Sequence, residues 1–271
     1  MRVPIVLTIV FLLFLLHQAV RASFEPGRLP PAYLALGSSG IASTQAPFFN
    51  VNPALLAFGS QSELNLQYRN FYNISQLNEF GLSFSTRLKR LPFGVFVRQF
   101  GDQNYKEQQA ALAVSFTIFE RLSFGFLFRN YFLQIKNYGH YYSYGLTAAL
   151  HLRILSWLNL ASVFGNFNEP KLTNQSKDIP VYFIQGVQIE VFPGARLTVD
   201  LFKDDRYDFD YRAGLSYQLN KMFNVLAGFR QQIHSFSFGI IFKRKFVTIS
   251  YALEIHPNLG ASNAVAVGYY F

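Results

Sequence analysis

The sequence contains no cysteine, which excludes disulfide scaffolds, thiolate zinc sites and cysteine nucleophiles. Charged residues are scarce, at 14% of the 271 residues, and Lys and Arg form no long basic block. A nucleic-acid partner is therefore not expected, although the formal net charge is +9. Beyond the N-terminus the sequence also lacks any apolar run that approaches the ~20 residues of a membrane-spanning helix.

Apolar and aromatic residues are abundant instead. They make up 51% and 18% of the chain, with 31 Phe and 16 Tyr. This composition excludes a disordered protein and a coiled coil. Because all-β barrels of this length fold as one unit, a single folded domain is expected.

Residues 1–22 have the pattern of an export signal. Arg2 precedes an apolar stretch at 5–16, and Val20-Arg21-Ala22 gives the small-x-small pattern that signal peptidase cleaves. The mature chain is predicted to begin at Ser23. A membrane-anchoring helix is the alternative, but the apolar stretch is too short for it. Export from a Gram-negative cell would lead to the periplasm, the outside or the outer membrane.

From residue 61 to the end, large apolar side chains alternate with small or polar ones. In 235–243, for example, Phe236 and Phe238 share one face of a strand, whereas Ser235 and Ser237 share the other. This period of two is typical of strands with one apolar and one polar face. It occurs both in soluble β-sandwiches and in membrane barrels, so periodicity alone does not separate the two.

The number and spacing of the strands favour a membrane barrel. Fourteen strands are predicted, at 61–70, 78–88, 91–99, 109–119, 121–132, 142–154, 157–165, 181–192, 195–203, 208–219, 222–230, 233–243, 245–255 and 262–271. Tight turns alternate with long polar connections at 100–108, 133–141 and 166–180, although Gln231-Gln232 is short where a long one is expected. This alternation is typical of outer-membrane barrels. The predicted fold is therefore an all-β, antiparallel transmembrane barrel of about 14 strands over 61–271, closed because unpaired strand edges cannot face lipid.

The C-terminal strand is a second indication of an outer-membrane barrel. Val265, Val267, Tyr269 and Phe271 share one face, and Phe is the last residue. This pattern resembles the terminal signal that the outer-membrane assembly machinery reads. Tyr269 and Phe271 are thus predicted as the assembly signal, with that machinery and outer-membrane lipid as partners.

Residues 23–60 lack strand alternation and are rich in Pro and Gly. A small-residue run, Gly37-Ser38-Ser39-Gly40, precedes a motif that reads Phe49-Asn50-Val51-Asn52-Pro53-Ala54-Leu55-Leu56-Ala57. This segment resembles the N-terminal hatch of FadL-type hydrophobic-compound transporters and of the related PorV/PorQ outer-membrane proteins. The resemblance implies a plug inside a fourteen-stranded barrel, with Phe49, Asn50, Asn52, Pro53 and Ala54 as its motif.

The motif also has a purely structural interpretation, which is compatible with the first. Asn52 is a suitable N-cap and Pro53 a suitable first residue for a short helix. The chain departs from the family in two respects. It lacks the usual acidic residue before the motif, having uncharged residues at 43–47, and its mature length is short.

Five arginines are predicted to point into the lumen and are the candidates for binding an anionic ligand group: Arg98, Arg129, Arg153, Arg212 and Arg230. Arginine presents a planar, permanently charged fork that suits the carboxylate of a fatty acid. The alternative is that these arginines pair with acidic side chains and with the plug.

Neither catalysis, metal binding nor a cofactor is predicted. The best pair for a nucleophile and its base is His234-Ser235, but neighbours in a strand point to opposite faces. The other mature histidines, His140, His151 and His256, form no set with the spacing of metal ligands.

Two functions remain open. The favoured one is passage of hydrophobic, fatty-acid-like molecules across the outer membrane, which makes a hydrophobic small molecule the partner. The alternative is an accessory protein of the type IX secretion system, similar to PorV/PorQ, that binds or delivers exported proteins; in either case the barrel is expected to be porin-like.

Overall fold

The computed structural model describes residues 24–25, 30–44, 48–89, 91–173 and 179–271. The predicted export signal at 1–22 lies outside these residues. Two short helices, α2 (Pro31–Ala35) and the 3-10 helix η1 (Pro53–Phe58), precede the strands. No helix in the described ranges is long and apolar enough to cross a membrane.

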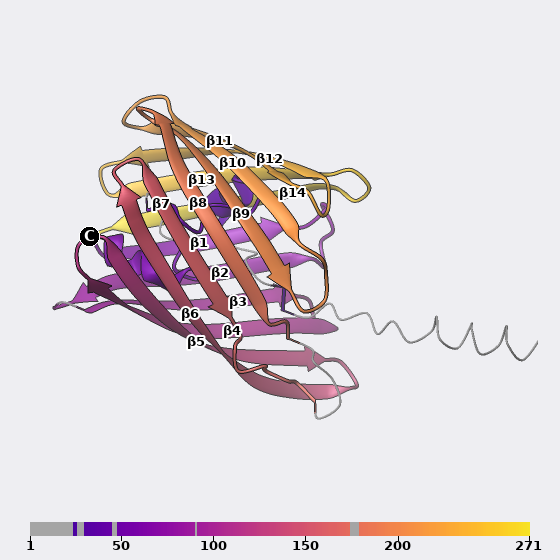
Figure 1. The fold of residues 1–271 in the computed structure, drawn as a ribbon. Coiled ribbons are helices and arrows are strands. Elements are labelled where there is room, and N and C mark those ends of the chain that lie inside the picture. The colour runs from indigo at the N-terminus through magenta and orange to yellow at the C-terminus, as the bar shows by residue number, and fades with distance from the viewer. Residues whose placement is uncertain (1–23, 26–29, 45–47, 90, 174–178) are drawn as a thin grey trace, which may run out of the picture.

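Fourteen strands follow (Figure 1). They are β1 (Glu63–Asn70), β2 (Asn78–Leu88), β3 (Leu91–Gly101), β4 (Tyr105–Ile118), β5 (Leu122–Ile135), β6 (Gly139–Leu155), β7 (Leu158–Gly165), β8 (Tyr182–Phe192), β9 (Ala195–Asp204), β10 (Asp210–Gln218), β11 (Phe223–Arg230), β12 (Ser235–Arg244), β13 (Val247–His256) and β14 (Gly260–Tyr270).

The strands form one closed, antiparallel barrel in which every strand pairs with its neighbours in sequence. The barrel closes where β1 pairs with β14, from Glu63 opposite Tyr270 to Asn70 opposite Asn263. Each strand therefore has a partner on both sides, and the prediction of a fourteen-stranded barrel is confirmed.

The period of two in the sequence separates the two faces of the barrel wall. In β12, Phe236 and Phe238 are 56% and 51% exposed on the outer face, whereas Ser235 and Ser237 are fully buried on the inner face. A barrel that turns its phenylalanines outward and its serines inward is suited to lipid outside and a polar lumen inside. The chain is therefore a membrane barrel rather than a soluble sandwich.

The predictions of long loops at 100–108 and 133–141 are wrong. Most of 100–108 lies in β3 and β4, and most of 133–141 lies in β5 and β6, so that three-residue turns remain at 102–104 and 136–138. The polar residues in these segments suggested loops, but several of them, such as Glu107, face the lumen within a strand. The third connection is long as predicted, since β7 ends at Gly165 and β8 begins at Tyr182. The turns at the other rim, such as Phe192 to Ala195, are short as predicted.

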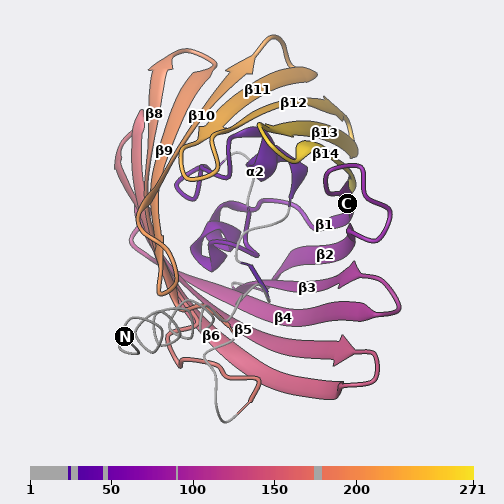
Figure 2. The ribbon, with the colours of Figure 1, turned by 90° about the vertical axis from the view of Figure 1, so that its right-hand side faces the viewer.

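The described parts of residues 24–60, here called the inner segment, lie inside the ring of strands (Figure 2). Helix α2 packs against β11 to β14, and η1 packs against β3 to β6. The largest apolar cluster joins Tyr33, Ile41 and Leu55 of the inner segment to inward residues of the wall such as Val163 and Ile184. The apolar core of this barrel is thus formed between its wall and its own N-terminal segment.

The outward face generates a prediction about membrane stability. Phe238→Lys places a charge near the middle of the apolar band and should lower the free energy of unfolding in lipid by about 2–4 kcal/mol, measured by urea titration. Phe119→Lys is the matched control, because Phe119 is 83% exposed in the turn between β4 and β5. There the same change should cost about 0–1 kcal/mol. Equal effects at both positions would contradict the assignment of the apolar band.

Candidate functional site: the lumen around the inner segment

Glycines on the inward face of the wall allow the inner segment to approach the wall backbone. A Cβ atom added to Gly228 would overlap the backbone of Leu36 and Gly37, and one added to Gly125 would overlap Pro53 and Ala54. The glycines that meet the inner segment in this way are Gly94, Gly125, Gly186, Gly214, Gly228 and Gly239. They lie on six different strands, so the wall is shaped to the inner segment around much of its circumference.

Asn52 holds two parts of the inner segment together. Its Oδ1 accepts a hydrogen bond from the Ala54 N–H at 3.0 Å, and its Nδ2 donates to the Ile41 carbonyl at 2.7 Å. Pro53 is the first residue of η1. The predicted N-cap is therefore confirmed, although the helix that it starts is a 3-10 helix rather than an α-helix.

The other residues of the motif contact the wall. The Phe49 ring lies over Gly94 of β3. The Ser123 hydroxyl donates to the Ala54 carbonyl at 3.1 Å, and Arg129 donates to the Asn50 carbonyl at 2.7 Å. The motif thus lies at the contact between the inner segment and β3 to β5.

Side chains of β6 and β9 bind the turn that follows α2. The Asp200 carboxylate accepts from the Ile41 N–H at 3.1 Å, and His151 Nε2 lies 3.1 Å from the Ala42 carbonyl oxygen. The 39–42 turn is therefore held through polar contacts in addition to apolar packing.

Tyr33 of α2 is buried in the lumen. Burial raises the pKa of its hydroxyl, and the nearby Arg212 opposes this shift.

Arg98 lies between two buried carboxylates. It is 3.1 Å from Glu79 and 3.3 Å from Glu107, and both acidic side chains are fully buried. Glu107 also accepts from the Tyr105 hydroxyl at 2.7 Å and from the Phe24 N–H at 3.1 Å. This network ties the start of the described inner segment to β2, β3 and β4.

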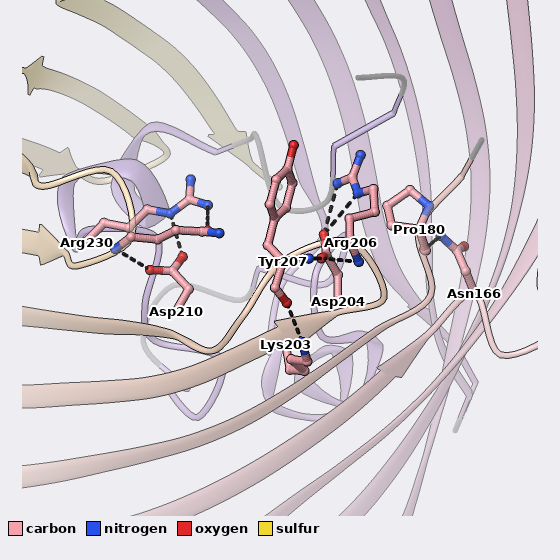
Figure 3. A network of polar contacts seen from close by, with 9 residues as sticks. Asn166, Pro180, Lys203, Asp204, Arg206, Tyr207, Asp210 and Arg230 are labelled. Atoms are coloured by element: carbon pink, nitrogen blue, oxygen red, sulfur yellow. Dashed lines mark hydrogen bonds and ion pairs between the residues drawn. The ribbon is translucent and has the colours of Figure 1, made fainter. Parts of the chain in front are cut away.

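A second network surrounds Asp210 at the same rim (Figure 3). Its carboxylate accepts from Arg212 Nε at 2.8 Å and from Arg230 Nε at 2.7 Å. Arg212 also donates to the Ser38 carbonyl at 3.4 Å, and its guanidinium lies 3.9 Å from the centre of the Phe202 ring. Asp210 thereby pairs with two of the five candidate arginines and offsets one of their two positive charges.

The fifth arginine, Arg153, lies toward the opposite rim, with its guanidinium 5.4 Å from the centre of the Phe58 ring. All five candidates therefore contact an acidic side chain or the inner segment. Their assignment as ligand-binding residues stays a prediction, and every one of them has a partner within the protein.

The sequence reasoning missed Glu79, Glu107 and the inward glycines. Glu79 lies on the inward face of a predicted strand, so alternation could have placed it in the lumen, although not beside Arg98 in particular. Glu107 was assigned to a loop, which hid it. The glycines carry no such signal, because their role depends on what lies opposite them in the lumen.

A cavity of about 400 Å³ lies between the inner segment and the rim that carries the C-terminus. The two sides of the cavity differ in polarity. The inner segment lines it with the apolar side chains of Ala32, Leu36, Phe48 and Phe49. The wall lines it mainly with polar side chains, including Asn65, Gln67, Ser83, Ser85, Thr248 and Ser250.

At the mouth of the cavity the charged groups are Glu63, Lys221 and Lys243. Lys243 Nζ lies 4.9 Å from the centre of the Tyr270 ring. The charges are mixed and few, so the mouth presents no strong field of one sign. A chamber with an apolar side and a wide polar wall can pass a small uncharged molecule between the two surfaces.

His234 and Ser235, the pair considered for catalysis, have different surroundings in the structure. His234 lies in the turn before β12, whereas the buried Ser235 hydroxyl donates to Glu254 at 3.2 Å. No group of three or more metal-ligating side chains occurs among the described residues.

The residues of the predicted assembly signal lie at the C-terminal rim. Tyr269 and Phe271 are 50% and 61% exposed, and their ring centres are 6.1 Å apart. The Phe271 N–H donates to the Ser62 carbonyl at 3.0 Å, which extends the pairing between the two ends of the barrel. Their recognition by assembly machinery stays a prediction.

Comparison with solved structures identifies the fold. The CymD monoaromatic hydrocarbon channel superposes with a TM-score of 0.70 at 12% identity, over 92% of this chain and 99% of that one. The toluene transporter TodX of Pseudomonas putida superposes with a TM-score of 0.66 at 12% identity, over 91% and 98%. The fold is that of outer-membrane hydrocarbon channels. The outer membrane protein Omp33 of Acinetobacter baumannii is also similar, with a TM-score of 0.52 at 9% identity, over 78% of this chain and 98% of that one.

No protein-family profile matches the sequence, and no curated protein matches it. The matched structures are outer-membrane proteins, and CymD and TodX are channels for small hydrophobic molecules rather than enzymes. Together with the apolar outer face, the fold places the chain among outer-membrane β-barrels. These comparisons give no support to the alternative of a secretion accessory protein.

The contacts of Asn52 generate a prediction about the inner segment. Asn52→Ala removes the cap of η1 and the bond to Ile41, which should destabilise this part of the segment by about 1 kcal/mol or more. Backbone amides of 54–58 should then exchange with deuterium faster, as measured by hydrogen-exchange mass spectrometry.

Asn220→Ala is the matched control, because Asn220 accepts from the Met222 N–H at 2.8 Å in a turn of the C-terminal rim. It should leave exchange at 54–58 unchanged. If Asn52→Ala has no effect on those amides either, Asn52 does not hold the segment.

Proposed function

We propose that this protein is an outer-membrane channel for small hydrophobic molecules, in which residues 23–60 form a plug that closes the lumen. The observation that carries the proposal is the fit between the inner segment and the inward glycines of the wall. Because glycines on six strands leave room for the inner segment, we infer that the segment belongs in the lumen. The FadL-like resemblance of the motif and the hydrocarbon-channel fold agree with this function.

The positions of the side-chain networks and of the cavity suggest the path of the cargo through the barrel. The Arg98 and Asp210 networks lie at the rim that carries the long connection between β7 and β8, and we assign this rim to the outside. The 400 Å³ cavity lies on the other side of the inner segment and opens at the C-terminal rim, which then faces the periplasm. A molecule that passes the plug would enter this cavity before it leaves the barrel.

The pairing of Arg98 and Arg212 with buried carboxylates favours uncharged cargo over fatty acids. A carboxylate that binds Arg98 or Arg212 must displace Glu79, Glu107 or Asp210, all of which are buried beside their partners. Leaving a buried carboxylate without its partner costs several kcal/mol. Small neutral molecules, of which aromatic hydrocarbons are one class, avoid this cost. The fatty-acid-like specificity expected from the sequence is therefore the less favoured form of the proposal.

Movement of the plug must accompany transport, because the lumen is packed where α2 and η1 meet the wall. Gly228→Val introduces a side chain into the backbone of Leu36 and Gly37 and should displace α2. The matched control is Gly268→Ala, an inward glycine whose added Cβ would meet only the ends of Asn65 and Glu63 at 3.0 Å and the Thr248 side chain.

Transport is tested in cells whose outer membrane lacks a hydrocarbon channel of its own. Expression of the parent protein should increase the initial rate of uptake of radiolabelled toluene several-fold over the empty vector, with little effect on oleate. Uptake equal to that of the vector for both compounds would refute the channel, and faster uptake of oleate alone would refute the preference for neutral cargo.

The plug is tested separately by ion conductance of the purified barrel in planar bilayers. Gly228→Val should conduct more than the parent protein, whereas Gly268→Ala should conduct as little as the parent. Heat-modifiable migration in gels verifies that each variant is folded. A folded Gly228→Val barrel without added conductance would show that the inner segment does not close the lumen.

A further inference from the structure

The outward face of β1 to β5 carries a shallow groove of about 520 Å³, separate from the lumen. Its apolar lining comes from five neighbouring strands. These side chains are Leu66, Phe80, Leu82, Val97, Ala110 and Phe132. Several are strongly exposed, with Leu66 at 61% and Phe80 at 53%.

The strand register explains the shape of the groove. Val97 and Ala110 lie directly opposite each other on β3 and β4 and form a low floor. Phe80 on β2 and Phe132 on β5 are the large side chains on either side of it. The small side chain of Ala110 between two phenylalanines leaves room along the wall for an extended chain.

One end of the groove is polar. Gln99, Gln108 and Asn130 line it on three neighbouring strands, and Gln108 Nε2 donates to Gln99 Oε1 at 2.8 Å. Beyond these amides, Lys106 lies opposite Gln134 in the register of β4 and β5. Since these positions alternate with the buried inward residues of each strand, the amides and Lys106 belong to the outer face.

The polar end lies at the level of lipid headgroups. Gln99 is eight residues after Leu91, the first outward residue of β3. At a rise of about 3.3 Å per residue and a tilt of about 40°, this distance covers about 20 Å of the ~25 Å apolar band. The amides are therefore near its outer edge, and Lys106 is beyond them.

At this end, the two cations Lys106 and Lys136 lie in or beside the turns at 102–104 and 136–138 and exceed the one carboxylate of these turns, that of Asp102. The acidic residues of the same strands, Glu79 and Glu107, point into the lumen and contact Arg98. Asp102 lies in the adjoining turn, where its carboxylate accepts from the Asn104 and Tyr105 N–H groups. Lys106 takes part in no ion pair among the described residues, so its ammonium group is available to an anion at the membrane surface.

We propose that this groove binds one lipid of the outer leaflet, a phosphorylated glycolipid. An acyl chain lies on Val97 and Ala110, sugar hydroxyls bond to the side-chain amides, and a phosphate contacts Lys106. Amides pair well with sugar hydroxyls, and an ammonium group pairs with phosphate. The assignment rests on the orientation given under the proposed function, with this rim outside, but it does not depend on the cargo or on the plug.

The test uses the purified full-length barrel in detergent and counts bound lipid by native mass spectrometry. The probes are hexa-acylated lipid A, its dephosphorylated form and phosphatidylglycerol. Ala110→Leu fills the floor of the groove, and its matched control is Ala227→Leu, an outward alanine opposite Phe238 on the other wall. Lys106→Gln removes the proposed phosphate contact, and Lys203→Gln is its control on β9.

The parent protein should retain one lipid A, and Ala110→Leu should bind it roughly tenfold more weakly, the effect of exposing about two methylene groups. Lys106→Gln should weaken phosphorylated lipid A and leave the dephosphorylated form unchanged, and both control variants should bind as the parent does. The proposal is overturned if Ala110→Leu binds like Ala227→Leu. It is also overturned if phosphatidylglycerol binds as tightly as lipid A. Because the readout is bound lipid, failure here is distinguishable from failure of the channel function, which is read from toluene uptake.

Discussion

Backbone N–H and C=O groups have no water to bond to in the hydrocarbon part of a bilayer, and the structure follows from this constraint. Every strand must have a partner on both sides, which a flat sheet cannot provide. The pairing of β1 with β14 supplies the missing partner and closes the barrel. Once the barrel is closed, the side chains of each strand divide between lipid and lumen, and the period of two becomes the dominant pattern of the sequence.

Closure moves the apolar core from its usual place. Outside the barrel, phenylalanines face lipid and need no protein partner. Inside, the lumen would be an aqueous channel unless the chain itself fills it. The inner segment places Tyr33, Ile41 and Leu55 inside it, and the inward glycines bring the wall close enough to touch its backbone. The polar contacts of Asp200, Arg129 and Ser123 with main-chain groups then satisfy a segment that has little secondary structure of its own.

The sequence allowed the architecture to be predicted because one rule, alternation, acts at every strand. This rule failed at Glu107, because a run of polar residues is typical of a loop. The run instead belongs to β4, whose polar face extends along the lumen. Asn52-Pro53 was also readable, since an N-cap depends only on neighbouring residues. The partner of Arg98 was not. Glu79 lies on the adjacent strand opposite Phe100 rather than opposite Arg98, so the pair follows only from the register.

The inner and outer surfaces of the wall near its outer rim differ in how their charged side chains are paired. Inside, Arg98 lies between Glu79 and Glu107, and these two carboxylates against one guanidinium leave little attraction for an anion. On the other side of the same strands, Lys106 has amide neighbours and no carboxylate partner among the described residues. A phosphate outside therefore meets a cation at low cost, whereas a carboxylate inside must displace one already bound. Alternation along β4, with Glu107 inward and Lys106 outward, thus places a carboxylate beside Arg98 on the lumenal surface and a cation on the outer surface of the same strand.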